Sequence, residues 1–391
     1  MGKLKVLHVI TTLPRLSGAA DNTRYTVNLL DPDRYEVHLA CGPAELDTLS
    51  VKTHIRVIVV KSLVRPFAPG LDLHALWKLW GLLRQEKYDI VHTHNAKAGV
   101  LGRVAAKLVG APIVIHTAHS ISFAASASPV TNWAYRLADR TCARLTDKII
   151  TVSTLNTKTY LEAGVGQRQQ YVTIYSGVET AKYLDRSARA ACRAELRIGS
   201  DDLLVVWIGR LNRQKDPLTY VQAAKLLSDR FPRMHFVIVG DDPLGESLEP
   251  AVRKLIADLQ LEHRLRLLGY RRDVDRILAA ADLVMHTSLY EGLGRSIVET
   301  MLVGIPLVAT AVDGVVEAVA SGERGGLLVP PSNPVALAQA AAELMDNPHL
   351  ASQVTAAGRS WALERFEVRD MVEGIDRLYQ QLWRDRLQRS L

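Results

Sequence analysis

The sequence predicts an α/β fold made of two doubly wound domains, and three observations predict it. Short, β-branched apolar runs alternate along the chain with longer amphipathic stretches. The apolar runs are continuous, which is typical of parallel strands that are covered on both faces. This alternation occurs in two series, and 391 residues exceed what one hydrophobic core usually fills.

The first series predicts an N-terminal domain over residues 1–180. Strands are expected at Val6–Ile10, Asp89–His92, Ile113–His116, Lys148–Val152 and Val172–Ile174. Helices are expected at Asp21–Leu30, Leu71–Glu86, Lys97–Val109 and Val130–Arg144. After Gly177 the chain is polar and irregular as far as about Arg197, which indicates a linker.

The second series predicts a C-terminal domain over residues 198–369, with a final helix at 370–391 that joins the first domain. Strands are expected at Leu203–Ile208, His235–Val239, Arg266–Leu268, Leu283–His286, Leu307–Ala309 and Leu327–Val329. Helices are expected at Pro217–Asp229, Glu246–Leu259, Ser296–Val303 and Val335–Met345. Ligands of such sheets bind at the carboxyl ends of the strands, so we expect the active site in a cleft between the two domains.

Composition limits the cellular compartments and the kinds of binding partner that are expected for this protein. Three widely spaced cysteines, Cys41, Cys142 and Cys192, form no CxxC pair and fit a reducing compartment. The N-terminus is too quickly polar for a signal peptide and no apolar run is long enough to span a membrane, so a cytoplasmic protein is expected. Residues 1–180 contain 21 Lys and Arg against 13 Asp and Glu, a net charge of +8. This half favours an anionic partner such as a membrane surface or a phosphate-bearing acceptor, with an ordinary solvated face as the alternative. No nucleic-acid motif is present.

Two strand-to-helix turns contain residues that suit phosphate binding. Gly18 precedes an expected helix, where backbone amides can approach an anion, although a plain turn explains it equally well. The first strand of the second series ends at Gly209 and Arg210, and Lys215 follows five residues later. An arginine fork and a lysine point charge could clamp a diphosphate. The alternative is a pair of exposed loop residues.

The segment EGLGRSIVE, from Glu291 to Glu299, carries paired carboxylates around two glycines. The amides of Gly292 and Gly294 can approach a ligand without a Cβ in the way. Carboxylates bind vicinal hydroxyls well, so Glu291 and Glu299 are candidates to hold a hexose and a ribose. The alternative is that both are solvated, which fits Glu299 poorly because its neighbours are apolar.

Several histidines and acidic pairs raise the question of a metal. His116 and His119 follow a strand, and His92 and His94 alternate along another, but neither pair has evident further ligands nearby. A structural role is favoured for His92 and His94, and contact with a sugar is a candidate role for a histidine of the pair His116 and His119. The acidic pairs Asp31/Asp33 and Asp273/Asp275 are interpreted as turn or cap chemistry. No metal site is therefore predicted.

Together these segments resemble family 4 glycosyltransferases, which are retaining enzymes of GT-B fold. The resemblance extends from Lys5 to about Phe366 and implies two Rossmann-like doubly wound domains facing each other across a cleft. It implies catalytic roles for Glu291, His119, Arg210 and Lys215, with His119 facing the donor sugar. The nucleobase would dock at Gly269–Val274, largely through backbone contacts. The donor-binding residues that it implies are Gly18, Gly209, Arg210, Lys215, Tyr270, Arg271, Glu291, Gly292, Leu293, Gly294 and Glu299.

The chain also departs from the family pattern. Ser17 stands where the family has the first glycine of a pair, Asp216 and Asp242 replace common glycines, Leu293 replaces a frequent phenylalanine, and Ser120 replaces a glycine. None of these changes removes a charge from the donor site. At three positions the chain resembles a bacterial branch of the family that builds exopolysaccharide or antigen units on lipid carriers. These positions are Asn22, Lys97 and Arg295. Asn22, Asn95 and Lys97 are the candidates for acceptor contact.

The activity implied by the resemblance is transfer of a hexose from a nucleotide-diphosphate sugar to a hydroxyl with retention at the anomeric carbon. The leaving diphosphate, held by Arg210 and Lys215, would help to deprotonate the acceptor, and stabilising its charge is where such a site gains most. No metal or other cofactor is expected, and a UDP-sugar is favoured over a GDP-sugar. The acceptor, the sugar and the linkage stay open.

Four alternatives remain beside this interpretation. A dinucleotide-dependent oxidoreductase would need G-x-G-x-x-G after the first strand, which the segment Thr11–Ala20 lacks. A GT-B nucleotide-sugar epimerase shares the fold but not the paired-glutamate segment. A non-catalytic binder of nucleotide sugars does not need the full set of clamp, histidine and glutamates. A transferase that acts on a small soluble acceptor stays open.

The segment from His119 to Arg144 predicts peripheral attachment to the inner face of a membrane. Its aromatic residues Phe123, Trp133 and Tyr135 are followed by Arg136, Arg140 and Arg144 at helical spacing. Such a helix can rest on an anionic bilayer with its aromatics at the headgroup level. The alternative is an ordinary amphipathic helix whose Trp133 and Leu137 pack inward.

Overall fold

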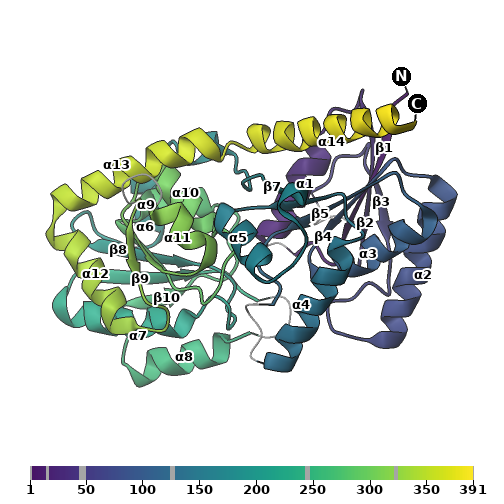
Figure 1. The fold of residues 1–391 in the computed structure, drawn as a ribbon. Helices are drawn as coiled ribbons and strands as arrows, with labels where there is room; N and C mark the ends of the chain where they lie inside the picture. The colour runs from purple at the N-terminus through teal and green to yellow at the C-terminus, as the bar shows by residue number, and fades with distance from the viewer. Residues whose placement is uncertain are drawn as a thin grey trace. The chain divides into compact units, whose positions relative to one another are not determined.

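The chain folds into two compact units, each built around one parallel sheet (Figure 1). The computed structural model describes residues 2–14, 17–43, 50–123, 128–242, 247–320 and 325–390. Unit 1 comprises Met1–Gly177 and Val368–Leu391, and unit 2 comprises Val178–Glu367. The predicted fold class, α/β with two doubly wound sheets, is confirmed. The sequence analysis placed the domains at 1–180 and 198–369, and residues 178–197, which it interpreted as a linker, belong to unit 2.

Unit 1 contains a seven-stranded sheet of order β3-β2-β1-β4-β5-β6-β7 in which all neighbouring strands are parallel. Its strands are β1 (Leu4–Ile10), β2 (Tyr35–Cys41), β3 (Arg56–Val59), β4 (Ile90–His94), β5 (Ile113–Ala118), β6 (Lys148–Thr151) and β7 (Tyr171–Thr173). The strand order reverses between β1 and β4. Ligands of open α/β sheets bind at this kind of switch point, outside the carboxyl ends of the strands.

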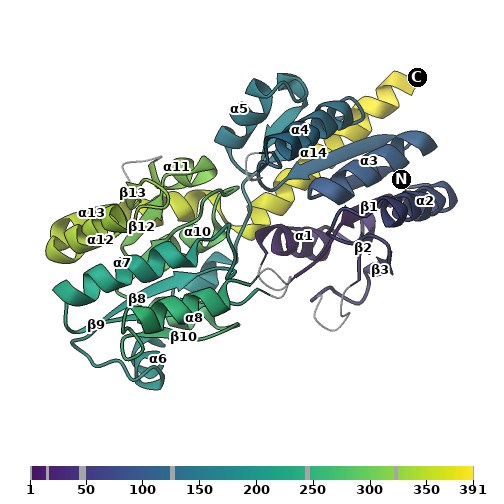
Figure 2. The ribbon, with the colours of Figure 1, turned by 90° about the horizontal axis from the view of Figure 1, so that it is seen from below.

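The sheet of unit 1 is covered by helices on both faces. The helices are α1 (Gly18–Leu29), α2 (Pro69–Glu86), α3 (Ala96–Val109), α4 (Pro129–Ala143), α5 (Thr154–Glu162) and the C-terminal α14 (Val368–Ser390). One core cluster joins β1 to α1 and α14, and a second joins the other face of β1 to α2 and α3 (Figure 2). Because α14 contributes Ile375 and Tyr379 to the first cluster, the end of the chain completes unit 1.

Unit 2 repeats this architecture with a six-stranded parallel sheet of order β10-β9-β8-β11-β12-β13. Its strands are β8 (Leu203–Ile208), β9 (Met234–Val239), β10 (Leu265–Leu267), β11 (Leu283–His286), β12 (Leu307–Thr310) and β13 (Leu327–Val329). Its helices are α6 (Arg189–Glu195), α7 (Pro217–Arg230), α8 (Glu249–Asp258), α9 (Val274–Ala280), α10 (Arg295–Val303), α11 (Asp313–Ala320), α12 (Pro334–Asp346) and α13 (Pro348–Arg365). The switch point lies between β8 and β11.

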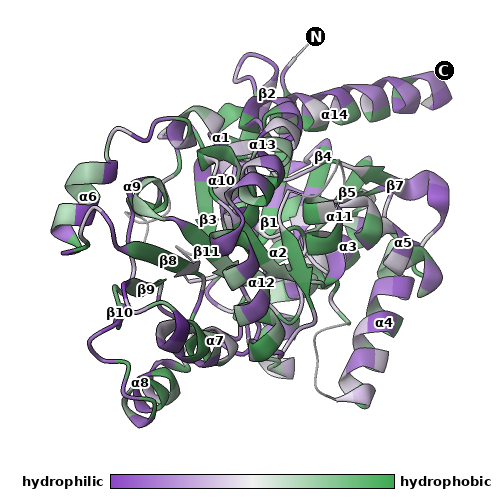
Figure 3. Ribbon diagram, turned by 90° about the vertical axis from the view of Figure 1, so that its left-hand side faces the viewer, coloured by the Kyte–Doolittle hydropathy of each residue, from purple (hydrophilic) through white to green (hydrophobic). Residues whose placement is uncertain are grey.

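Hydropathy follows this layering. Most strand residues are apolar, whereas the helices carry both apolar and polar residues (Figure 3). In the described part of the chain, no helix combines the length and the apolar character that crossing a membrane requires.

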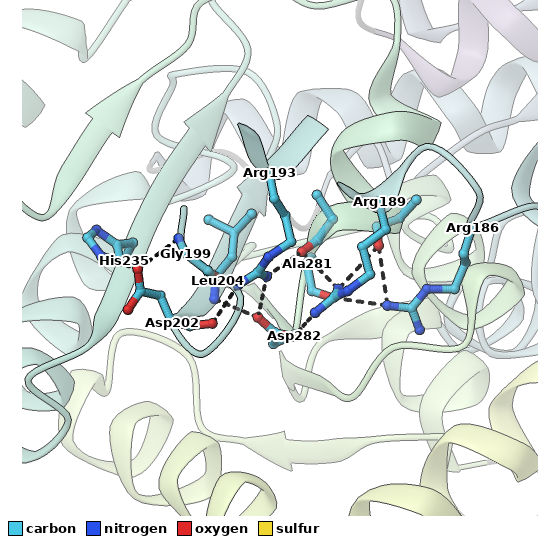
Figure 4. A network of polar contacts seen from close by, with 11 residues as sticks. Arg186, Arg189, Arg193, Gly199, Asp202, Leu204, His235, Ala281 and Asp282 are labelled. Carbon is cyan, nitrogen blue, oxygen red and sulfur yellow. Dashed lines mark hydrogen bonds and ion pairs between the residues drawn. The ribbon is translucent and has the colours of Figure 1, made fainter. Parts of the chain in front are cut away.

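The segment after Gly177 corrects one expectation. It was predicted to be an irregular linker as far as Arg197, but it contains a 3₁₀ helix, Thr180–Tyr183, and α6, which packs on α9. Its arginines explain its polar appearance, because they bind the carboxyl end of α9 (Figure 4). Unpaired carbonyls at a helix end need such donors.

Asp282 connects this arginine cluster to the sheet. Its carboxylate accepts from Arg189 at 2.6 Å, from Arg193 at 3.0 Å and from the backbone amide of Leu204 in β8 at 2.8 Å (Figure 4). Arg193 is 5% exposed and also donates to the carbonyl oxygen of Asp202. The cluster therefore fastens α6 to both α9 and β8.

We expect the substitution Asp282→Asn to lower the free energy of unfolding by about 1–2 kcal/mol, because an amide keeps the shape but weakens the charge-assisted bonds. The measurement is a thermal melt of the full chain. The matched control is Asp229→Asn, which alters an exposed pair with Lys225 in α7 and is expected to change little. Equal melting temperatures for the two variants would show that the cluster adds no stability.

Candidate active site

The clamp expected from the sequence lies at the switch point of unit 2. Gly209 and Arg210 directly follow β8, and Lys215 lies one residue before Asp216, the N-cap of α7. The guanidinium of Arg210 donates to the side chain of Gln214 at 2.9 Å, and Lys215 forms an ion pair with Glu291. Both cations of the prediction thus lie in the loop that follows β8, and Glu291 follows the neighbouring strand β11, at the carboxyl ends where this fold places its ligands.

Buried hydrogen bonds fix the backbone of this clamp loop. The hydroxyl of Thr287, which is fully buried, bonds to the carbonyl oxygens of Lys215 and Asp216, both at 2.8 Å. It also accepts from the indole N–H of Trp207 in β8 at 2.8 Å. Asp216 has a φ of 45°, a backbone conformation that glycine adopts most easily, and it caps α7 through Thr219. The hydrogen bonds of Thr287 and the cap at Asp216 therefore fix the backbone of the clamp loop.

Glu291 lies in the loop between β11 and α10 and is 8% exposed. The loop is tied to the clamp by Gln214, which donates to the carbonyl oxygen of Tyr290 at 3.1 Å. Gly294 has a φ of 83°, and a Cβ there would lie 2.8 Å from the side chain of Ile297, so this turn requires a glycine. Burial beside Lys215 gives the Glu291 carboxylate the charged partner that a buried charge needs.

Glu299 lies on α10 and is 7% exposed. The side chain of Arg295, one turn earlier, donates to it at 2.9 Å. The alternative in which Glu299 is solvated is therefore wrong. The paired glutamates therefore occupy similar environments, each with one cation, but one lies in the loop and the other in the helix.

Asp313 is a half-buried carboxyl group that the sequence analysis missed. It accepts from the backbone amide of Glu291 at 2.9 Å, and its own φ is 35°. Burial, reinforced by the charge of Glu291, raises the pKa of this carboxyl above its usual value, although the amide bond opposes the rise. The only sequence signal was an Asp-Gly pair after a strand, which is an ordinary turn.

The segment expected to receive the nucleobase is a turn fixed mainly by its backbone. Gly269 has a φ of 63°, and its carbonyl oxygen accepts from the amide of Gly240 at 2.8 Å. The guanidinium of Arg271 binds Asp273 and Glu195, each at 2.8 Å, which raises its pKa further. Tyr270 is partly buried beside it. These contacts suit recognition by main-chain groups better than recognition by the arginine.

In unit 1, the expected site residues follow β1, β4 and β5. Gly18 is the first residue of α1, which Ser17 caps, and a Cβ on Gly18 would meet nothing within 4 Å. Unit 1 itself therefore does not require a glycine there. His119 follows β5, and Nε2 of its ring lies 3.1 Å from Nδ1 of His94. Burial lowers the pKa of His119 to about 3, so its imidazole is neutral at physiological pH.

The three candidates for acceptor contact are held by neighbours in unit 1. The amide of Asn22 is buried and donates to Ser176 at 2.9 Å. The ammonium of Lys97 binds Asp72 of α2 at 2.6 Å and a backbone carbonyl. Asn95 has a φ of 61° and precedes α3 without capping it through its side chain. Acceptor contact by these residues stays a prediction.

Among the described residues, one group meets the distance criterion for a metal site, namely His8, His92 and His94. Their nitrogens already bond to one another and to neighbouring side chains: His8 Nδ1 lies 3.0 Å from His94 Nε2. The acidic pair at Asp31 acts as a turn, as expected, since Asp31 accepts from the amide of Asp33 at 2.9 Å. Independence from metal stays a prediction.

Comparison with known proteins matches both units. The family model described as "Glycosyltransferase Family 4" matches residues 16–182, and the model described as "Glycosyl transferases group 1" matches residues 188–361. The chain is 30% identical to UDP-Gal:alpha-D-GlcNAc-diphosphoundecaprenol alpha-1,3-galactosyltransferase of Escherichia coli over 80% of each chain. It is 29% identical to the glycosyltransferase EpsD of Bacillus subtilis over 88% of each.

Among solved structures, the fold is similar to that of Alr3699/HepE of Anabaena in complex with UDP-glucose. The TM-score is 0.82 and the identity 23%, over 97% of this chain and 100% of that one. At this identity the likeness shows the fold, which is GT-B.

Proposed function

The chain belongs to glycosyltransferase family 4, and from this premise we propose that it transfers a hexose from a UDP-sugar to a hydroxyl of a lipid-linked acceptor in polysaccharide assembly. It is a glycosyltransferase that uses a nucleotide-sugar donor and retains the anomeric configuration, as this family does. The nucleobase, the acceptor and the roles of individual residues belong to the proposal.

The observation that carries the proposal is the meeting of two loops at the switch point of unit 2. The clamp loop brings Arg210 and Lys215, and the loop before α10 brings Glu291. A bound phosphate is negatively charged. It would compete with Glu291 for the ammonium group of Lys215, or bind that group together with Glu291. A diphosphate that develops charge as the sugar leaves is stabilised there by cations already in place. We assign the ribose to Glu299 and the reacting sugar to Glu291 and His119.

The relatives support the base and the acceptor. The Escherichia coli enzyme is named for a UDP-galactose donor and a diphosphoundecaprenol-linked acceptor, and the Anabaena structure holds UDP-glucose. A thermal-shift panel of UDP- and GDP-sugars tests the donor, since a ligand present at 100 times its Kd stabilises a fold by about 2.7 kcal/mol. Stabilisation by GDP-sugars alone would contradict the assignment of uridine.

Transfer is tested by incubating a stabilising UDP-sugar with a polyprenyl-diphosphate-linked GlcNAc acceptor in excess EDTA, and by reading the anomeric configuration of the product by NMR. We expect an α-linked product from an α-linked donor without added metal. Activity that is lost in EDTA and restored by manganese would contradict independence from metal. Transfer to a soluble sugar but not to the lipid would support the alternative of a small acceptor.

The outer surface of α4 supports work at a membrane. Trp133 is 64% exposed and Leu137 also faces solvent, so the alternative in which they pack inward is wrong. One part of the expectation is also wrong, because Phe123 is buried and packs against Tyr160. Arg140 donates to the carbonyl oxygen of Ala163 and is not free to meet lipid phosphates through that nitrogen.

We expect the protein to sediment with phosphatidylglycerol vesicles at low salt and less so at high salt, since screening weakens attraction between exposed charges. The variant Trp133→Ala should bind more weakly at an unchanged melting temperature. The matched control is Leu226→Ala, which removes an exposed apolar side chain from α7 in unit 2. Equal sedimentation with neutral vesicles would contradict an electrostatic membrane contact.

A further inference from the structure

Four histidines and a tyrosine form a continuous chain of hydrogen bonds inside unit 1. His92 connects the hydroxyl of Thr117, at 2.7 Å from Nε2, with the hydroxyl of Tyr379, at 2.5 Å from Nδ1. The Tyr379 hydroxyl lies 3.3 Å from Nε2 of His8, whose Nδ1 lies 3.0 Å from Nε2 of His94. His94 then reaches His119 at 3.1 Å. We call this set the imidazole chain.

The imidazole chain joins elements that are distant in the sequence. His8 lies on β1, His92 and His94 lie on the same face of β4, and Tyr379 comes from α14. All four of these side chains are completely buried. Burial lowers the pKa of His8 to about 3 and holds those of His92 and His94 well below the usual value, so the rings are neutral.

A neutral imidazole carries one N–H and one acceptor nitrogen, and this fixes the chain to two arrangements. In the first, every donor points toward His119, which then presents an N–H at Nδ1. In the second, every donor points the other way, and His119 presents an acceptor at Nδ1. This atom is buried and has no hydrogen-bond partner among the described residues. What His119 offers at Nδ1 is thus coupled to the four groups behind it.

A metal site is the competing explanation of the same histidines, and the ring geometry disfavours it. The rings of His92 and His94 stack at 4.4 Å with an angle of 26°, and those of His8 and His94 stack at 5.3 Å with 14°. Ligand lone pairs lie in the ring planes and must converge on a bound ion. Stacked rings that bond to one another through their nitrogens are instead arranged as a chain.

We propose that His8, His92, His94 and Tyr379 are positioning residues, whose hydrogen-bond chain selects the tautomer that His119 presents to its ligand. The inference rests on the proposed function in one respect, the contact of His119 with the donor sugar. A fixed tautomer matters there because a sugar hydroxyl meets either a donor or an acceptor, and a mixture of tautomers leaves part of the enzyme mismatched. Through Tyr379, the C-terminal helix sets a property of the site.

The test is Tyr379→Phe, which deletes only the hydroxyl that joins His92 to His8. In ¹⁵N-histidine-labelled protein, two-bond ¹H–¹⁵N spectra distinguish protonated from unprotonated ring nitrogens, and His119→Ala assigns the signals. We expect one tautomer of His119 in the wild type and a mixture in the variant. The turnover number kcat should fall by about 10-fold at an unchanged donor KM, the sign of an interaction used in the transition state.

Tyr35→Phe is the matched control. The ring of Tyr35 packs edge-on against Tyr379, and its hydroxyl bonds to Asp376 and Gln380 of the same helix, outside the imidazole chain. It should lose stability without a change in tautomer or kcat. If Tyr379→Phe does not fold, Thr117→Val and Thr117→Ser serve in its place, because the serine keeps the hydroxyl at the far end of the chain and should rescue the tautomer.

The outcomes separate the two proposals. If the tautomer of His119 is unchanged in Tyr379→Phe or Thr117→Val, the imidazole chain does not select it, whatever the activity of the variant. A shifted tautomer with wild-type kcat overturns the positioning role, whereas wild-type turnover in His119→Ala overturns the role proposed for His119 itself. A stoichiometric metal in the purified protein, lost together with the tautomer signature in His92→Gln, would establish the metal site instead.

Discussion

Replacing Lys215 by alanine is expected to lower turnover by about 10²-fold or more, because the leaving diphosphate loses a cation at the moment its charge develops. Arg210→Ala is expected to act similarly. The fold should survive both changes, since the loop is fixed by Thr287 through its backbone carbonyls and not through the side chain of Lys215. The measurement is kcat at a saturating concentration of the UDP-sugar, together with the melting temperature of each variant.

The structure supplies a control for the charge left behind. Lys215→Ala leaves Glu291 buried without its ion-pair partner, which alone costs stability. The double variant Lys215→Ala/Glu291→Gln removes that stray charge and should regain stability but not turnover. Lys254→Ala, which alters an exposed pair on α8, is the matched surface control. Near-wild-type turnover in Lys215→Ala would remove the clamp from the mechanism.

The strands that the sequence predicted are rich in apolar and β-branched residues, and β8 is an uninterrupted apolar run from Leu203 to Ile208. The strands β2 and β3 were both missed, and only β2 has polar residues between its apolar ones. In β2, Glu36 is exposed while His38 is buried and lies 2.8 Å from the hydroxyl of Tyr88, a partner invisible from the local pattern. The edge strand β3 is four residues long and partly exposed, although Val57, Ile58 and Val59 form a continuous apolar run. In β2, a tertiary partner and not the local pattern accounts for the buried His38.

In the candidate site, the sequence identified the charged residues and missed their neutral supports. Arg210, Lys215, Glu291 and Glu299 have a charge that needs a stated partner, so their spacing was informative. Thr287 acts through one hydroxyl aimed at backbone carbonyls across the switch point of unit 2. No spacing rule predicts that a threonine will bind backbone carbonyls in this way, because these main-chain atoms come near it only in the folded protein.

For the histidines, too, the sequence could not predict the hydrogen-bond partners. His92 and His94 were interpreted as structural because two residues on one strand share a face. Their partners His8 and Tyr379 lie 84 and 287 residues from His92, and only the pairing of β1 with β4 and the docking of α14 unite them. A chain of neutral donors and acceptors leaves no charge pattern in the sequence.

Glu299→Ala and Glu291→Ala are expected to divide the work of the paired glutamates. Both carboxylates are buried to a similar degree and each binds one cation, so the two substitutions form a matched pair. Glu299→Ala should weaken UDP binding by about 10- to 100-fold, which corresponds to losing hydrogen bonds between a carboxylate and the ribose hydroxyls. Isothermal titration with UDP measures this directly.

Glu291→Ala should leave UDP binding unchanged or make it tighter. In the structure Glu291 holds Lys215, so removing the carboxylate frees the ammonium for the diphosphate. Transfer should nevertheless fall, because Glu291 is assigned to the reacting sugar, and interactions made only in the transition state lower kcat when lost. If UDP binds Glu291→Ala more weakly than Glu299→Ala, the ribose belongs to the loop carboxylate and the two roles must be exchanged.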